Sequence, residues 1–254
     1  MRSFSAYESE TQQRLEHVRS RMATALLQSA SSNGTVGLIA VSKGHPAAAI
    51  RSFYALGLRD FAENYAQELL AKADELQDLT DIRWHFIGKI QSNKAKKIAQ
   101  VAQFIHGVDR LPLLSELAKG ASVLHPLHVF LQIQVDEHDL NKSGCPYEQA
   151  QELCQALSQN PAIVWEGFMG MGPADASNDR LHFLYERFIQ RAHQLWEKFA
   201  PRDPSRQARP MQVSLGMSED LEIAIRCGAT HIRIGSALFG PRPKKVKPPE
   251  NAHP

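Results

Sequence analysis

Lys43 occupies a position in this sequence that is typical of a reactive amine. It follows the apolar run at 36–42 and precedes a turn at 44–46 that contains glycine and proline. A lysine placed where a buried strand meets a loop holds its amine in a partly desolvated pocket, which lowers the pKa of the amine and makes it a nucleophile toward carbonyl groups. Most lysines are solvated, however, and a strand can end on a surface charge. The position alone therefore leaves two interpretations, a Schiff-base site and a solvated strand end.

Two turns rich in serine and glycine have the composition of an anion-binding site. The first is SLGMSED at 214–220, and the second is RIGSALFG at 233–240; a helix is predicted to start in each. Unpaired backbone N–H groups and the positive end of a helix dipole attract an anion, and serine hydroxyls add further donors. Each turn alone is equally typical of a helix cap or a tight turn, but the pair together with Lys43 favours a phosphate site. The candidate residues are Ser214, Gly216, Ser218, Gly235 and Ser236.

The elements that must carry these residues are strands of a parallel sheet. Apolar runs of strand length alternate with helical patterns, and helix starts are marked at Pro46 and at 218–220. The pattern predicts an α/β protein that forms a (β/α)8 TIM barrel, whereas six or seven real strands would permit an open doubly wound sheet. The predicted strands cover 36–42, 60–64, 83–88, 104–108, 128–135, 164–171, 212–215 and 231–235.

A barrel would bring the candidate residues to one rim. Ligands of TIM barrels bind at the carboxyl ends of the strands. Lys43 follows the first predicted strand, Asn64 ends the second, and Arg233 lies in the eighth. The two serine-glycine turns follow the seventh and eighth strands, where barrels commonly bind phosphate. We therefore expect all of these residues around a single mouth.

The two ends of the chain differ from the alternating pattern. An extra helix is predicted before the first strand, because Leu15, Val18, Met22 and Leu26 form one apolar stripe, and we expect it to pack over the bottom or side of the barrel. A single barrel domain is predicted over residues 1–242. Residues 243–254 are rich in proline and lysine and cannot bury an apolar face, so they are predicted to form a flexible tail.

The composition argues against several classes of protein. With 254 residues and 43% hydrophobic content, the chain can bury a sizeable core, and 29 Lys and Arg against 27 Asp and Glu do not favour a nucleic-acid or membrane surface. No segment has the length and hydropathy of a signal peptide or a membrane span. The three cysteines lack the spacing of metal ligands or of a disulfide framework. We expect a cytoplasmic protein with a small-molecule partner and no metal.

A phosphate site beside a carbonyl-seeking lysine suggests pyridoxal 5'-phosphate as the ligand. From the end of the eighth strand, Arg233 would point its guanidinium at the pyridine nitrogen. Arginine keeps its protons, so it would donate to that nitrogen and leave the ring unprotonated, which weakens the ring as an electron sink. A carboxylate partner would keep the ring nitrogen protonated and so strengthen the ring as an electron sink. Arg233 therefore argues against transamination and decarboxylation.

Seven segments of the chain resemble one known family. Together they are similar to the YggS-type (PROSC-type) pyridoxal phosphate homeostasis proteins, over residues 10 to 242. The resemblance implies a barrel like the N-terminal domain of alanine racemase, which is fold type III among pyridoxal phosphate proteins. The segments are AVSKGHP at 40–46, FAENY at 61–65, WHFIGKIQSNK at 84–94, NKSG at 141–144, GFMGMGP at 167–173, SLGMSED at 214–220 and RIGSALFG at 233–240.

The resemblance also assigns roles to the candidate residues. It implies that Lys43 forms an aldimine with the cofactor, that Arg233 contacts the ring nitrogen, and that Asn64 lies along the cofactor face. It implies no catalytic residue and no metal ligand. His85 falls within a family motif, and we expect it to be a satisfied core histidine. The phosphate loops correspond to Ser214, Gly216, Ser218, Gly235 and Ser236.

The function that the resemblance implies is non-catalytic. The protein would hold pyridoxal phosphate as a Lys43 aldimine for buffering or delivery, act as a monomer, and meet pyridoxal-phosphate-dependent apoenzymes transiently. We expect it to lack the β-rich domain that supplies the second base of alanine racemases. One alternative is a weak amino-acid racemase, in which Tyr65 or His85 would have to serve as that base. Another is an aldolase that uses Lys43 on a phosphorylated sugar without a cofactor.

Overall fold

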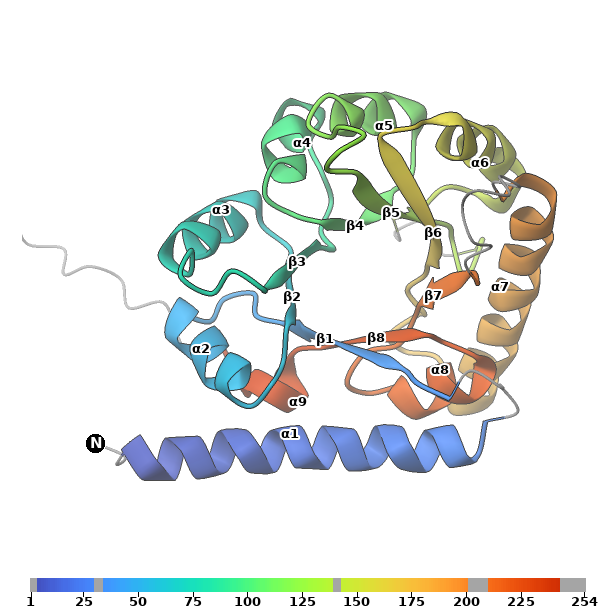
Figure 1. Ribbon diagram of the computed structural model, residues 1–254. Helices are drawn as coiled ribbons and strands as arrows, with labels where there is room; N and C mark the ends of the chain where they lie inside the picture. The colour runs from blue at the N-terminus through green and yellow to red at the C-terminus, as the bar shows by residue number, and fades with distance from the viewer. Residues whose placement is uncertain (1–3, 30–33, 139–142, 201–209, 243–254) are drawn as a thin grey trace, which may run out of the picture.

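The computed structural model describes residues 4–29, 34–138, 143–200 and 210–242. Eight parallel strands form a closed barrel in the order β1 to β8 (Figure 1). Closure comes from β1 and β8, which pair from Gly37 opposite His231 to Ala40 opposite Ile234. The predicted TIM barrel is confirmed, and an open sheet is excluded. The strands are β1 (Gly37–Val41), β2 (Asp60–Glu63), β3 (Arg83–Phe86), β4 (Phe104–Val108), β5 (Leu127–Gln132), β6 (Ile163–Met169), β7 (Gln212–Ser214) and β8 (His231–Ile234).

Helices form the outer layer of the barrel, as Figure 1 shows. Most strands lead into a helix that packs on the sheet, and the apolar strand residues that face outward, such as Phe61 and Ile232, join the main core under these helices. One short 3₁₀ helix, η1 (Tyr147–Gln149), precedes α6. The helices are α1 (Phe4–Leu27), α2 (Ala47–Ala55), α3 (Ala66–Glu75), α4 (Ser92–Ala99), α5 (Leu111–Ala118), α6 (Ala150–Gln159), α7 (Asn178–Phe199), α8 (Leu221–Cys227) and α9 (Ser236–Phe239).

Much of the barrel interior is filled by aromatic and imidazole rings. Phe130 on β5 contacts His231 on β8 with ring centroids 5.8 Å apart, and because β5 and β8 are not neighbours this contact crosses the interior. His85 stacks on Phe104, with centroids 4.4 Å apart. The interiors of TIM barrels are more often built from valine, isoleucine and leucine. Buried imidazoles need hydrogen-bond partners, so this interior must contain a polar network.

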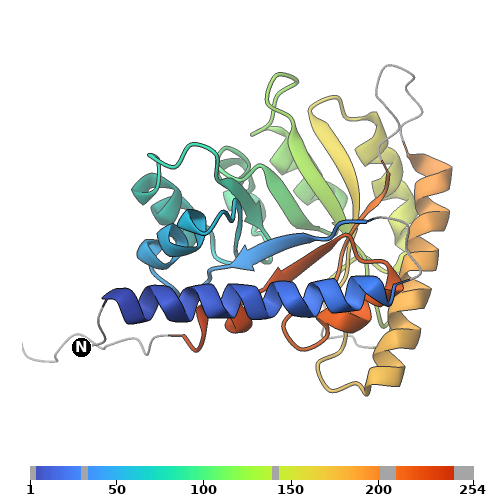
Figure 2. The same ribbon diagram turned by 60° about the horizontal axis from the view of Figure 1, so that its bottom comes forward.

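The extra helix α1 lies along the side of the barrel. Figures 1 and 2 both show it beside α8 and α9, against which it packs. Leu15 and Val18 of the predicted apolar stripe are fully buried, while Met22 and Leu26 are partly buried against the core. The predicted helix and its stripe are therefore confirmed.

Arg21 connects α1 to the loop after β7. Its Nε and Nη2 donate to the Glu222 carboxylate at 2.6 and 2.9 Å, and Nη2 also donates to the Ser218 carbonyl oxygen at 2.9 Å. A bidentate pair of this kind fixes orientation as well as adding energy. The N-terminal helix thus supports one of the two loops that were predicted to bind an anion.

The Arg21→Met substitution is expected to lower the free energy of unfolding by about 1 kcal/mol, because the pair is partly exposed and screened. Thermal unfolding measured by circular dichroism would show a decrease in Tm of about 2–4 °C for a chain of this size. Arg51→Met is the control, since Arg51 makes a similar pair with Asp78 at a more exposed place. An equal decrease in Tm in both variants would contradict the role of Arg21 in supporting the loop after β7.

The remaining expectations concern the ends of the chain and membranes. The tail predicted over 243–254 lies outside the described residues. Among the helices that the structure describes, none combines the length and hydropathy needed to cross a membrane.

Candidate functional site at the barrel mouth

The carboxyl ends of the strands bring the candidate residues to one rim. Lys43 follows the end of β1, and Arg233 lies near the end of β8, which pairs with β1. A Cβ atom on Gly235 would lie 3.4 Å from the Val41 carbonyl oxygen, so the turn after β8 passes directly beside the strand end that carries Lys43. The neighbourhood that the sequence predicted for Lys43, Arg233 and this turn is present.

The environment of Lys43 favours its neutral amine. The side chain is partly buried, and this burial lowers the pKa of the amine below the ordinary lysine value. The positive charges of Arg242 and Arg233 lower the pKa further, while Glu63 opposes them. A lower pKa gives a larger fraction of nucleophilic amine at neutral pH. This is the direction that a carbonyl-seeking lysine requires.

A buried ion pair supports the loop that carries Lys43. Lys72 on α3 lies 2.5 Å from the Glu63 carboxylate, and both side chains are almost completely buried. Lys72 also donates to the Ser42 carbonyl oxygen at 2.9 Å, and the Ser42 hydroxyl donates to Glu63 at 2.7 Å. The backbone immediately before Lys43 is therefore fixed from the helix layer.

The backbone immediately after Lys43 is fixed as well. The Gly44 N–H donates to the Glu68 carboxylate at 2.7 Å, and Glu68 is also paired with Lys72 at 2.9 Å. The imidazole of His45 packs on Phe239, with ring centroids 5.2 Å apart. Sequence reasoning missed this support, although an acidic residue at the end of an apolar strand, as at Glu63, was a signal that could have drawn attention to it.

Arg233 is buried and held by two hydrogen bonds. Nη1 donates to the Ser214 hydroxyl at 2.8 Å, and Nη2 donates to the Gly170 carbonyl oxygen at 2.9 Å. Burial lowers the pKa of the guanidinium to about 10, while Tyr185 and Asp220 act in the opposite direction, so Arg233 remains charged at neutral pH. Ser214 was predicted among the phosphate-binding residues, but its buried hydroxyl is bonded to Arg233.

The two serine-glycine loops lie side by side. The Ser236 hydroxyl lies 3.3 Å from the Ser218 hydroxyl, and the Ala237 N–H donates to the Ser218 hydroxyl at 3.4 Å. Gly216 has a φ of +88°, and a Cβ atom there would lie 2.5 Å from the Ala224 Cβ, so only glycine fits. Ser218, Ser236 and the Ala237 N–H thus form one small cluster, to which the Ser214 hydroxyl does not belong.

Asp220 fixes the first of these loops, a role that the sequence did not suggest. Its carboxylate accepts from the Met217 N–H at 2.6 Å and from the Tyr185 hydroxyl. Burial raises the pKa of Tyr185 far above its usual range, and the charge of Asp220 adds to this effect. Tyr185 therefore stays protonated and acts as a donor to Asp220.

Asn64 lies near the rim, but the structure gives it other neighbours. It lines a cavity of about 300 Å³ between α3 and α4, together with Tyr65, Lys89 and Lys94. Its Oδ1 is buried, and within the described part of the chain it has no hydrogen-bond partner. No hydrogen bond joins Asn64 to Lys43 or Arg233 among the described residues, so its place along a cofactor face stays a prediction.

Comparisons with known proteins find relatives over most of the chain. The family model described as alanine racemase, N-terminal domain, matches residues 15–243. A pyridoxal phosphate homeostasis protein from Pseudomonas aeruginosa is 42% identical over 226 residues, which cover 89% of this chain and 93% of the relative. The protein of the same name from Escherichia coli K12 is 36% identical and covers 90% of this chain and 95% of its own length.

Solved structures give the same result. PipY from Synechococcus elongatus, solved with pyridoxal phosphate bound, is 35% identical with a TM-score of 0.76, covering 91% of this chain and all of that one. Alanine racemase from E. faecalis is 14% identical with a TM-score of 0.62, and 60% of its length is covered, so it shares the fold alone. A family model that matches nearly the whole barrel, together with relatives of this identity and coverage, shows that the chain belongs to the family of pyridoxal phosphate homeostasis proteins, built on the alanine racemase N-terminal domain.

Proposed function

We propose that this protein binds pyridoxal 5'-phosphate and serves its homeostasis, holding the cofactor as a Lys43 aldimine for buffering or delivery without catalysing a reaction of its own. The observation that carries the proposal is the partly buried Lys43, whose pKa is lowered and which lies at one rim with the fixed charge of Arg233. The names of the relatives and the pyridoxal phosphate bound to PipY support the cofactor and its homeostasis. The cytoplasm as location, a monomeric state and transient transfer to apoenzymes belong to this proposal.

The residues at the mouth fit the three chemical parts of the cofactor. Lys43 offers an amine to the aldehyde, and Arg233 offers a charged donor to the ring nitrogen. The hydroxyls of Ser218 and Ser236 offer donors to the phosphate. When bound, pyridoxal phosphate supplies an aldehyde and an electron-accepting ring. Because Arg233 cannot give up its proton readily, it keeps that ring unprotonated and its electron demand low.

Two features of the chain support binding over racemisation. A racemase needs a second acid-base group on the far face of the cofactor. Both ring nitrogens of His85 are hydrogen-bonded, to His106 and to Asp60, inside the barrel. Tyr65 is 57% exposed at the start of α3. Among the described residues, no partner holds either side chain in the mouth in an orientation for proton transfer.

The test of this function is a titration of the purified protein with pyridoxal phosphate, followed by borohydride reduction and peptide mapping. We expect a visible band that differs from that of the free cofactor, and a reduced adduct on the peptide that contains Lys43. No band, or an adduct confined to other lysines, would contradict the proposal. Colourless protein that cleaves a phosphorylated sugar would favour the aldolase.

A racemase would be detected by exchange of the α-hydrogen of amino acids. Incubation of the cofactor-loaded protein with L-alanine in D2O is expected to give no α-deuterium by NMR, and no D-alanine by chiral chromatography. Deuterium incorporation at a rate that falls in Tyr65→Phe would establish racemisation as the function instead.

A further inference from the structure

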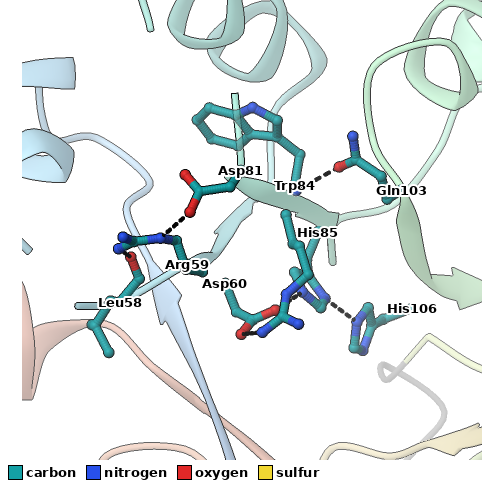
Figure 3. Close-up of polar contacts among 9 residues, drawn as sticks. Leu58, Arg59, Asp60, Asp81, Trp84, His85, Gln103 and His106 are labelled. Carbon is teal, nitrogen blue, oxygen red and sulfur yellow. Dashed lines mark hydrogen bonds and ion pairs between the residues drawn. The ribbon is translucent and has the colours of Figure 1, made fainter. Parts of the chain in front are cut away.

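A continuous chain of hydrogen bonds crosses the barrel beneath Arg233. From below, His85 Nε2 lies 3.0 Å from Asp60 Oδ1, and His85 Nδ1 lies 2.9 Å from His106 Nε2. His106 Nδ1 lies 2.9 Å from the Ser214 hydroxyl, which lies 2.8 Å from Arg233 Nη1. Figure 3 shows the lower part, where the imidazole of His85 lies between Asp60 and the imidazole of His106. The chain joins β2, β3, β4, β7 and β8.

With both imidazoles neutral, the two ends of this hydrogen-bond chain fix the direction of every bond in it. The Arg233 guanidinium can only donate, and the Asp60 carboxylate can only accept. Ser214 therefore accepts from Arg233 and donates its own hydrogen to His106 Nδ1. His106 must then carry its proton on Nε2 and donate to His85, which in turn carries its proton on Nε2 and donates to Asp60. When both imidazoles are neutral, only this assignment of protons makes all four bonds.

The surroundings keep both histidines neutral and still. Burial lowers the pKa of His85, although Asp60 acts against this, and it lowers the pKa of His106 well below the usual value. The rings are stacked, His85 on Phe104 and His106 on Phe130, with centroids 4.4 and 4.2 Å apart. The other titratable groups that act on these two rings or lie beside them are Arg83 on β3, His128 on β5, Glu166 on β6 and His231 and Arg233 on β8.

Asp60, the last residue of the hydrogen-bond chain, is held by Arg83 close to solvent. Arg83 Nη2 donates to Asp60 Oδ2 at 2.5 Å, and the Arg83 side chain is 57% exposed, against 22% for Asp60. Although burial opposes it, the hydrogen bonds from His85 and Arg83 lower the pKa of the Asp60 carboxyl. Asp60 is therefore ionised at neutral pH, as the direction of the chain requires.

We propose that Asp60, His85 and His106 are positioning residues for the contact between Arg233 and the ring nitrogen of the cofactor. The one-way chain holds the Ser214 hydroxyl in the acceptor orientation that Arg233 needs, and so fixes the guanidinium before a ligand arrives. Ser214 then belongs to the support of Arg233, and its hydroxyl is not free for the phosphate. The identity of the ligand in this inference rests on the proposed function, whereas the hydrogen-bond chain from Asp60 to Arg233 is present in the protein without a ligand.

The first test uses the ligand-free protein with ¹⁵N-labelled histidine. Two-dimensional NMR is expected to show His85 and His106 neutral, with the proton on Nε2, from about pH 6 to pH 8. Asp60→Asn removes the group that can only accept, so the fraction of the Nε2–H form should fall for both rings. An Nδ1–H form in the wild type, or unchanged tautomers in Asp60→Asn, would overturn the assigned direction.

The second test measures the affinity for pyridoxal phosphate by visible titration. Asp60→Asn and His106→Gln are expected to weaken binding about tenfold, the effect of one well-placed hydrogen bond, with thermal unfolding as the check that each variant is folded. His128→Gln is the matched control, because His128 pairs with Glu166 and stands outside the chain. It should bind within about twofold of wild type.

The outcomes separate this inference from the proposed function. Wild-type protein that fails to bind pyridoxal phosphate would overturn the proposed function and the ligand named here. The histidine tautomers would still test the direction of the hydrogen bonds, because that measurement needs no ligand. Wild-type binding that Asp60→Asn and His106→Gln leave unchanged, or that His128→Gln weakens equally, would overturn the positioning role alone.

Discussion

Lys43→Ala protein mixed with pyridoxal phosphate is expected to show no visible band beyond that of the free cofactor and no adduct after borohydride reduction. The substitution removes the amine and leaves Arg233 and the serine loops in place, so weak non-covalent binding should remain. Because the covalent bond is lost, we expect the affinity to fall about tenfold or more. Visible spectroscopy measures the band, peptide mapping detects the adduct, and equilibrium dialysis measures the affinity.

The control for this experiment is Lys89→Ala. Lys89 is exposed and lines the neighbouring cavity between α3 and α4, so its loss should leave the band and the mapped adduct intact. Loss of the band in Lys89→Ala with retention in Lys43→Ala would move the covalent site to that cavity. Thermal unfolding should be nearly unchanged in both variants, since neither lysine belongs to the buried ion pairs of the described residues.

The pH dependence of adduct formation gives an independent view of Lys43. An ordinary lysine, with a pKa of about 10.4, has only about 0.1% of its amine neutral at pH 7.4. Burial and the charges of Arg242 and Arg233 lower the pKa of Lys43, so its rate of adduct formation should level off at a lower pH than that of a lysine peptide. Coincident profiles would show that the mouth does not activate the amine.

The architecture could be predicted because each strand has a local signature. Apolar runs bounded by Pro46, Gly57 and Gly228 mark the repeated units, and all the predicted strands are present. The predicted ends extend too far: β5 stops at Gln132 instead of 135, and β7 stops at Ser214 instead of 215. Buried apolar residues continue past the ends of these strands, as Ile133 and Leu215 show, because the loops at the mouth are themselves packed.

The common location of Lys43, Arg233 and the serine-glycine loops followed from barrel geometry alone. Barrel geometry did not predict which of the two serine hydroxyls in the motif at 214–220 points into the barrel. Ser214 and Ser218 lie in the same motif, yet the hydroxyl of Ser214 is bonded to Arg233 and His106 inside the barrel. Residues that alternate along a short strand face opposite sides, and the sequence does not reveal where the strand gives way to the loop.

The buried polar networks could not be predicted because their partners are distant in sequence. His106 lies within the apolar run at 104–108 and is bonded to a serine 108 positions away. Lys72 and Glu68 have the spacing of an exposed helical pair, and charged residues are rarely fully buried. Only the packing of α3 against β2 shows that Lys72 reaches the Glu63 carboxylate.

Lys72→Met is expected to lower the free energy of unfolding by about 3–5 kcal/mol at pH 7.5, the usual effect of removing one partner from a buried ion pair. The Glu63 carboxyl would lose its buried partner in a site with 0% exposure, and its Oε2 already has no partner among the described residues. Chemical denaturation followed by circular dichroism measures the loss. Lys119→Met is the control, because the Lys119–Glu116 pair is exposed and should contribute at most about 0.5 kcal/mol.

The loss in Lys72→Met should depend on pH in a defined direction. Burial raises the pKa of the Glu63 carboxyl above its usual 4.5, even with Lys72 opposing it. Removing Lys72 raises that pKa further, so the folded variant binds a proton that the unfolded chain releases above about pH 4.5. Its stability is therefore retained below the unfolded pKa and decreases as the pH rises through the folded pKa. A deficit that is equal at pH 5 and pH 8 would contradict a buried, uncompensated Glu63.

A double substitution separates the charge of Glu63 from the packing of Lys72. Combining Glu63→Gln with Lys72→Met removes both charges, and the double variant should recover most of the stability that Lys72→Met loses. It still lacks the bond from Lys72 to the Ser42 carbonyl oxygen, so the backbone before Lys43 is less firmly held. We therefore expect borohydride reduction to fix pyridoxal phosphate on Lys43 more slowly in the double variant, even when its stability is restored. The reason is that the bond from Lys72 to the Ser42 carbonyl oxygen orients the Lys43 amine as well as stabilising the fold.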